Sequence, residues 1–133
     1  MSSALLDTSA LINAVDADAV EELPFDRLFI SSLSYAELRL GLVTARDVRT
    51  LRQRSRRIES IERSFGRGLP FDDACALEYE QLVQLSVDHG LSARSHTVDR
   101  MIAAVAVAHE IPLVTSNGSD VRGLESVLDI VVL

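Results

Sequence analysis

The segment from Thr97 to Asp120 has the most distinctive pattern of apolar and polar positions in the chain. Its first part is apolar almost all round from Met101 to Ala108, which predicts a helix buried inside a domain rather than on its surface. A short apolar strand at 113–115 and a polar loop follow. An acidic residue nevertheless stands at each end, Asp99 in the first turn of the helix and Asp120 beyond the strand. Carboxylates at both ends of a buried unit require an explanation, because burying a charge is costly.

The remaining sequence alternates short apolar runs with longer segments of helical character. Ser34 and Thr97 are each placed to cap the helix that follows them. The alternation predicts a three-layer α/β/α fold with a short, mostly parallel central sheet. Without a repeat, a low-complexity segment or a linker, the chain is predicted to form a single domain over residues 1–133. Strands are predicted at 4–6, 28–30, 113–115 and 128–133, and helices at 10–15, 35–45, 47–65, 74–89 and 97–108.

Composition narrows the class of protein. The chain has 133 residues, of which 47% are hydrophobic, and this favours a globular protein with a real core. Cys75 is the single cysteine, so we expect a small core residue in a reducing compartment. The longest strictly apolar run, Ile102 to Ala108, is far too short to cross a bilayer. The N-terminus lacks the features of a secretory signal. We therefore expect a cytoplasmic protein with no membrane segment.

Charge is distributed unevenly. All 13 basic residues are arginine, and the lack of lysine excludes chemistries that need a P-loop or Schiff-base lysine. The net charge is −7, but the segment from Arg46 to Arg67 holds eight arginines and three acids, so that it carries +5 and the rest −12. A basic patch on an acidic body can bind phosphates. A solvated helix with internal ion pairs, such as Glu59–Arg63, is the alternative.

Four acids stand where functional groups gather in a parallel α/β fold. Asp7 follows the first predicted strand and Asp120 the third, while Glu37 and Asp99 lie on helix faces predicted to point inward. Each also has a structural explanation, because Asp7 can cap a helix, Glu37 can reach solvent at a helix edge, and Asp99 and Asp120 can serve as a first-turn acid and a loop cap. His96 is predicted to be a surface-loop residue.

If the first and third strands are neighbours, all four carboxylates converge outside the carboxyl ends of the strands. Two like charges about 4 Å apart repel by about 4 kcal/mol at an effective dielectric constant of 20. Four ionised groups therefore need a cation or partial protonation. Oxygen ligands without clustered histidines suit Mg²⁺ or Mn²⁺, as one or two ions. Such a centre supports phosphodiester hydrolysis.

Four segments also carry a family resemblance. They are LLDTSALI at 5–12, SSLSYAEL at 31–38, DRMIAA at 99–104 and LVTSNGSD at 113–120. In this order they resemble the signatures of PIN-domain nucleases, and most closely those of the VapC-type toxins of bacterial toxin–antitoxin modules. The resemblance implies a metal-dependent endoribonuclease whose acidic metal-binding and catalytic positions are Asp7, Glu37, Asp99 and Asp120. Supporting polar positions would be Thr8, Ser9 and Asn117, with the choice between Asp120 and Asn117 left open.

The resemblance further implies an RNA substrate, typically tRNA or rRNA. It also implies a homodimer and a heterocomplex with a cognate VapB-type antitoxin, whose C-terminal segment often places a basic residue in the acidic site. The loop at 91–96 departs from the family, which often has a Gly-Arg pair before the third acid. The residues expected to contact RNA are Arg46, Arg49, Arg52, Arg56 and Arg94.

Two other classes of protein are alternatives to this hypothesis. A non-catalytic regulatory or interaction module on the same fold would keep the acids as structural caps. A phosphoacceptor receiver or an aspartate-nucleophile phosphatase also places acids beside Mg²⁺. The lack of lysine counts against both, and so does Ser9 for the phosphatase, which needs a second aspartate at that position.

Overall fold

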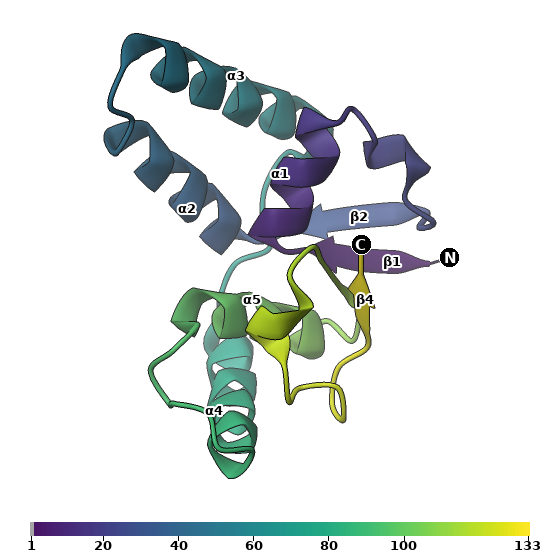
Figure 1. Ribbon diagram of the computed structural model, residues 1–133. Helices are drawn as coiled ribbons and strands as arrows, with labels where there is room; N and C mark the ends of the chain where they lie inside the picture. Colours follow the sequence, from purple (N-terminus) through teal and green to yellow (C-terminus); the bar gives the residue numbers. More distant parts are fainter. Residues whose placement is uncertain (1) are drawn as a thin grey trace.

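The computed structural model describes residues 2–133 and places four parallel strands between two layers of helices (Figure 1). The strand order is β2-β1-β3-β4, and each pairing is parallel. Because parallel strands end at the same edge of a sheet, the residues that follow β1 and β3 are brought together there. The strands are β1 (Ser3–Leu6), β2 (Arg27–Ile30), β3 (Leu113–Thr115) and β4 (Ile130–Val132).

The helices divide between the two faces of the sheet. In Figure 1, α1, α2 and α3 lie above the strands, and α4 and α5 lie below them. No helix within residues 2–133 has the length and apolarity needed to span a membrane. The bounds are α1 (Thr8–Asp16), α2 (Ser32–Val43), α3 (Val48–Phe65), α4 (Asp73–Asp88) and α5 (Thr97–Ala108), with short 3-10 turns η1 (Val20–Glu22) and η2 (Gly118–Val121).

Side chains of β1 alternate between two apolar clusters, one on each face of the sheet. Leu5 packs into the cluster formed with α4 and α5, whereas Ala4 and Leu6 pack into the cluster formed with α1, α2 and α3. Successive side chains of a strand point to opposite faces, so a strand covered on both sides is apolar throughout. The predicted three-layer α/β/α architecture is confirmed, and its sheet is parallel throughout the described residues.

The central helix α5 is buried as its sequence predicts. Ile102, Ala103, Ala104, Val105 and Ala106 are all 0% exposed. The small side chains let α5 approach its neighbours closely, and the helix packs most extensively against α4. Cys75 on α4 is also 0% exposed and belongs to the same cluster. The prediction that this cysteine is a small core residue is therefore confirmed.

Two of the predicted helix caps are wrong. Helix α2 begins after Ser31, whose hydroxyl accepts a hydrogen bond from the Leu33 N–H at 3.0 Å. Ser34 lies buried inside the first turn, where its hydroxyl meets another side chain instead of a free N–H. Helix α5 begins at Thr97, and His96 is its N-cap residue. Thr97 does not cap the helix, because its hydroxyl donates to the carbonyl of Arg94, earlier in the chain. The predicted final strand is also too long, since β4 covers only Ile130–Val132.

A tight backbone contact fixes the start of α2. The Ser32 N–H donates to the Leu69 carbonyl at 3.0 Å, and the Leu69 N–H donates to the Ile30 carbonyl at 2.8 Å. The segment before α4 thus runs along the end of β2. A Cβ atom on Gly68 would lie 2.5 Å from Ser32 N and 2.7 Å from the carbonyl carbon of Ser31. Only glycine permits this approach, so Gly68 helps to set the position of α2.

We therefore expect Gly68→Ala to destabilise the fold by about 1–3 kcal/mol, because its Cβ would displace backbone atoms. Gly41→Ala is the matched control. It lies inside α2, its nearest neighbour would be 3.7 Å away, and alanine should add about 0.5–1 kcal/mol of helix stability. Urea denaturation of both variants measures the difference in the free energy of unfolding. Equal stability of the two variants would contradict the proposed close contact.

Candidate active site

Asp7 lies at the junction between β1 and α1 and is only 5% exposed. Its Oδ1 atom accepts hydrogen bonds from the Ala10 N–H at 2.9 Å and from the Ser9 hydroxyl at 2.8 Å. Asp7 is therefore the N-cap of α1, which is the structural role that the sequence predicted for it. Its Oδ2 atom accepts no hydrogen bond from residues 2–133. One oxygen thus anchors the side chain and leaves the other available.

Glu37 reaches the same edge of the sheet from α2. Thr8 donates its hydroxyl proton to Glu37 Oε1 at 2.5 Å, and the Thr8 and Ser34 hydroxyl oxygens are 2.9 Å apart. Because a hydroxyl has one proton, Thr8 accepts from Ser34 while it donates to Glu37. A short relay of hydroxyls therefore orients the carboxylate. It connects the beginning of α1 with α2.

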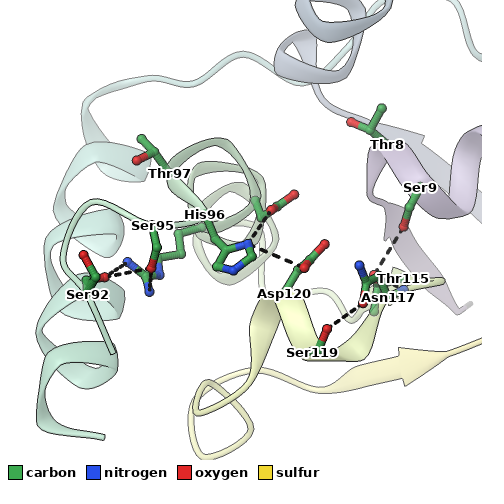
Figure 2. A network of polar contacts seen from close by, with 12 residues as sticks. Thr8, Ser9, Ser92, Ser95, His96, Thr97, Thr115, Asn117, Ser119 and Asp120 are labelled. Atoms are coloured by element: carbon green, nitrogen blue, oxygen red, sulfur yellow. Dashed lines mark hydrogen bonds and ion pairs between the residues drawn. The ribbon is translucent and has the colours of Figure 1, made fainter. Parts of the chain in front are cut away.

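Asp99 and Asp120 meet around a histidine (Figure 2). His96 Nδ1 lies 3.3 Å from Asp99 Oδ2 and 3.5 Å from Asp120 Oδ1. Asp99 comes from the first turn of α5, and Asp120 from η2, which follows β3. The exposed fraction of the side chain is 31% for Asp99, 24% for Asp120 and 46% for His96. The sequence predicted a surface position for His96, and its contact with both acids was missed.

A buried arginine holds the loop that carries His96. Arg100 is 2% exposed, and its guanidinium donates to the Ser92 carbonyl at 2.7 Å and to the Ser95 hydroxyl at 3.3 Å. Figure 2 shows the dashed lines to Ser92 and Ser95, on the other side of His96 from Asp120. The signal available in the sequence was a single arginine immediately before the apolar part of a helix predicted to be buried. A charge at such a position needs buried acceptors, and here the preceding loop supplies them.

The polar residues after β3 support the site in different ways. The Ser9 hydroxyl accepts from the Ser116 N–H at 3.2 Å, which ties α1 to the end of β3. Asn117 Oδ1 accepts from the Ser119 hydroxyl at 2.7 Å, so this side chain closes its own turn. Asp120 instead faces His96 (Figure 2). The structure thus brings Asp120, and not the Asn117 side chain, to the other acids.

Burial and mutual repulsion both disfavour the ionised form of the carboxylates in this site. Burial raises the pKa of Glu37, the Thr8 hydrogen bond opposes this, and the negative charges of Asp99 and Asp7 raise it further. Burial also raises the pKa of Asp99, to which Asp120 and Asp7 contribute, while His96 opposes the shift. These influences connect all four predicted acids. Their convergence follows from the adjacency of β1 and β3, which pair through Leu6 and Val114.

This set of donor atoms fits a divalent cation. It consists of carboxylate oxygens, which suit Mg²⁺ or Mn²⁺, together with one imidazole nitrogen. One donor atom each from His96, Asp99 and Asp120 lies within 4.8 Å of the others. Asp7 and Glu37 add negative charge that a cation would offset. The residues present can therefore hold the kind of ion that the sequence predicted.

The arginines predicted to contact RNA lie on the surface. Arg46, Arg49, Arg52, Arg56 and Arg94 are all exposed, and their side chains have no hydrogen-bond or ion-pair partner within residues 2–133. Around the helical axis, Arg49, Arg52 and Arg56 fall within about 60° of one another, on the side of α3 opposite the buried Ile58.

Other arginines of α3 are occupied by structural contacts. Arg57 pairs with Asp16 at 2.7 Å, and Arg54 donates to the Gly41 carbonyl at 2.6 Å. The expected pair Glu59–Arg63 is absent from the described residues. The bridge near that end of the helix joins Arg39 to Glu62.

Comparison with known proteins agrees with this architecture. The PIN domain family matches residues 4–125. A VapBC-5 structure from Mycobacterium tuberculosis, described as a member of a toxin–antitoxin family, superposes with a TM-score of 0.78 at 26% identity, covering 100% of both chains. FitAcB from Neisseria gonorrhoeae gives a TM-score of 0.74 at 27% identity over 96% of each chain.

A DNA-bound VapBC from Salmonella typhimurium gives a TM-score of 0.74 over 98% of this chain and 97% of that chain. At 22% identity, this last similarity concerns the fold alone. No curated protein matches the sequence.

The raised carboxylate pKa values lead to a test of stability. A carboxyl group whose native pKa is raised contributes stability when protonated, and loses it as pH rises from the ordinary value of 3.8 through the native pKa. Asp99→Asn should therefore raise the melting temperature of the metal-free protein at pH 7.5, by about 3–5 °C for each kcal/mol gained when the buried charge and its repulsion by the other acids are removed. The difference in melting temperature between this variant and the native protein should be smaller at pH 5.

Asp129→Asn is the matched control for this measurement. Asp129 is exposed and precedes β4, at the opposite edge of the sheet. We expect no gain in melting temperature for this variant at either pH. If Asp99→Asn lowered the melting temperature at pH 7.5, or behaved like the control, burial of the ionised Asp99 beside the other acids would not be a significant strain on the fold.

Proposed function

The chain belongs to the PIN domain family, and from this premise we propose that it is a metal-dependent endoribonuclease toxin of the VapC type. The observation that carries the proposal is the convergence of Asp7, Glu37, Asp99 and Asp120 at one edge of the sheet. Three of these acids come from three different helices or caps, and the fourth from the turn after β3. A structural role as separate caps would not require them to share one electrostatic site.

In this proposal Asp7, Glu37, Asp99 and Asp120 hold one or two Mg²⁺ or Mn²⁺ ions. The chemistry that such ions supply when bound is to lower the pKa of a water molecule and to offset the charge of the developing phosphorane. Thr8 and Ser9 keep two of the carboxylates in place through the hydrogen bonds already described. Asn117 has an indirect role, because its side chain stabilises the turn that leads to Asp120.

The substrate is proposed to be RNA, with tRNA or rRNA as the natural candidates. The exposed arginines of α3 and Arg94 would bind backbone phosphates, because unpaired guanidinium groups attract polyanions even on a protein of net charge −7. Arg94 lies in the loop that also carries His96, beside Asp99. In this proposal one phosphate contact lies in the loop that carries His96, and the others lie on α3, which packs against α2.

A cognate VapB-type antitoxin is the proposed partner, within a heterocomplex that contains a toxin homodimer. Support comes from the solved neighbours, which are described as toxin–antitoxin systems. A groove between α2 and α3 begins at Thr8 and Glu37 and extends to Thr44. Leu40 and Val43, which are 62% and 84% exposed, lie along this end of α2. Such a groove with apolar side chains suits a bound peptide segment that reaches the acids.

Catalysis is tested by RNA cleavage with Mg²⁺ or Mn²⁺. Asp7→Asn and Asp99→Asn should each lower the rate by about 100-fold or more, as expected when a preorganised electrostatic group is lost. Asparagine can still cap α1 at position 7, so the first variant should fold. Gel electrophoresis of tRNA and rRNA at successive times measures the rate at which cleavage products accumulate.

Asp129→Asn, purified in the same way, controls for the loss of one acidic charge and should cleave like the native protein, while the two site variants control for contaminating ribonuclease. Cleavage should stop when EDTA is added. Activity that survives both site substitutions and chelation would reject the nuclease proposal. The alternative, a non-catalytic interaction module with the same fold, would then be the better explanation.

The RNA surface makes a separate prediction. Arg52→Gln together with Arg56→Gln should weaken RNA binding and lower the slope of log affinity against log salt concentration by about 0.7 for each lost phosphate contact. The rate at saturating RNA should remain unchanged, because neither residue lies among the acids.

Arg27→Gln is the control for charge. Arg27 is exposed at the amino end of β2, where it lies over the Phe29 ring at 5.2 Å. Fluorescence anisotropy at several salt concentrations, with a catalytically inactive Asp99→Asn background, gives the slopes. A slope that falls as much for each arginine removed in Arg27→Gln as in the double variant would indicate a general charge effect and not a binding face on α3.

A further inference from the structure

His96 is the histidine that meets the acids. Its Nδ1 atom is 3.3 Å from Asp99 Oδ2 and 3.5 Å from Asp120 Oδ1, so one ring nitrogen faces two carboxylates at once (Figure 2). The chain has three histidines. His89 Nδ1 instead contacts the Leu85 carbonyl at 2.8 Å, and His109 is exposed at the C-terminal end of α5.

The backbone holds the ring in this position. His96 has φ 52° and ψ 39°, in the left-handed region that residues with a Cβ seldom adopt. This conformation turns the chain sharply into α5, so that residues 96 and 99 present their side chains to the same point. Arg100 fixes the preceding loop through Ser92 and Ser95. The imidazole is therefore attached to a braced segment and not to a loosely held one.

We propose that His96 is a nitrogen ligand of the metal held by Asp99 and Asp120, and that it makes the site select Mn²⁺ over Mg²⁺. This inference rests on the proposed metal-dependent function. It adds a nitrogen ligand and a metal preference to that function, because carboxylate oxygens suit either ion. Mn²⁺ accepts an imidazole nitrogen among oxygen ligands, whereas Mg²⁺ favours oxygen donors and keeps its water molecules, so a nitrogen ligand favours Mn²⁺ over Mg²⁺.

The spacing of the donor atoms is suited to shared coordination. In an octahedral site with bonds of about 2.1 Å, adjacent ligand atoms are about 3 Å apart. The distances from His96 Nδ1 to the two carboxylate oxygens, 3.3 and 3.5 Å, are slightly longer. A small inward movement of the side chains would bring all three atoms to one ion. The Asp99 carboxylate has hydrogen-bond geometry to Nδ1, so it lies on the side of the ring where the Nδ1 lone pair points when Nε2 carries the proton.

A positioning role is the competing explanation. In that explanation, a protonated Nδ1 would donate a hydrogen bond to the carboxylates and would not bind the metal. Both roles predict some loss of activity when His96 is replaced. Only direct ligation places a nitrogen nucleus in the first coordination sphere of the ion, so the test must observe that nucleus.

Pulsed electron paramagnetic resonance of bound Mn²⁺ provides this observation. The full chain is prepared without a histidine tag, stripped of metal, and loaded with less than one equivalent of Mn²⁺ in a nitrogen-free buffer. Spin-echo modulation from a coordinated ¹⁴N is expected in the native protein. It should disappear in His96→Asn, a substitution chosen because asparagine tolerates the left-handed backbone.

His109→Asn is the matched control, since residues 96 and 109 flank the two ends of α5, about 20 Å apart along the helix. This variant should keep the nitrogen signal. Competition titrations should show that His96→Asn lowers the affinity for Mn²⁺ by at least about tenfold, as losses of groups around a metal do. The affinity for Mg²⁺ should change by less than twofold.

The outcomes separate this inference from the proposed function. If native protein binds Mn²⁺ without a nitrogen signal, His96 is not a ligand, although cleavage of RNA with Mg²⁺ can still establish the nuclease. If the affinities for the two ions fall equally in His96→Asn, the proposed selectivity is overturned. If no Mn²⁺ binds and no RNA is cleaved, both proposals fail. The native spectrum decides the question of ligation even where the variant fails to fold.

Discussion

Electrostatic repulsion among carboxylates is the constraint on which the rest of this structure depends. Two such charges about 4 Å apart repel by about 4 kcal/mol at an effective dielectric constant of 20, and a whole domain has a margin of only about 5–15 kcal/mol. The fold nevertheless directs four acids to one edge, and burial raises the pKa values of Glu37 and Asp99 there. Two of the acids are held by specific donors, Asp7 by a backbone N–H and a hydroxyl and Glu37 by Thr8. The other two lie against His96 Nδ1, at 3.3 and 3.5 Å.

The elements that bear these acids are correspondingly rigid. The apolar helix α5, with five consecutive residues at 0% exposure, keeps Asp99 at a fixed height against the sheet. Gly68 admits the close backbone contact that sets the start of α2, and thereby the position of Glu37. Arg100 secures the loop before α5. The strain of gathering like charges is thus opposed by packing and hydrogen bonds several residues away from the acids themselves.

Much of this arrangement could be predicted from the sequence, because it follows from local patterns. Continuous apolar runs indicated strands covered on both faces, and the cap at Asp7 followed from its place before a helix. The sequence could not predict that β1 and β3 are neighbours, on which the convergence of the acids depends, since strand order is set by contacts between distant segments. The contact of His96 with two acids could not be predicted, because it depends on a left-handed residue and on a loop fixed by a buried arginine. The caps at Ser34 and Thr97 were wrong for a related reason, namely that their hydroxyls have tertiary or backward partners.

The arginines show why charge counted along a sequence is a poor guide to charge available at a surface. The segment from Arg46 to Arg67 has a net charge of +5, but its arginines do different things in the fold. Arg57 and Arg54 are engaged with Asp16 and the Gly41 carbonyl, and they join α3 to α1 and α2. Arg49, Arg52 and Arg56 have no such partners within residues 2–133 and lie together on the solvent side. The same helix therefore serves both packing and an exposed positive face, and only the second contribution can attract phosphates to an otherwise acidic protein.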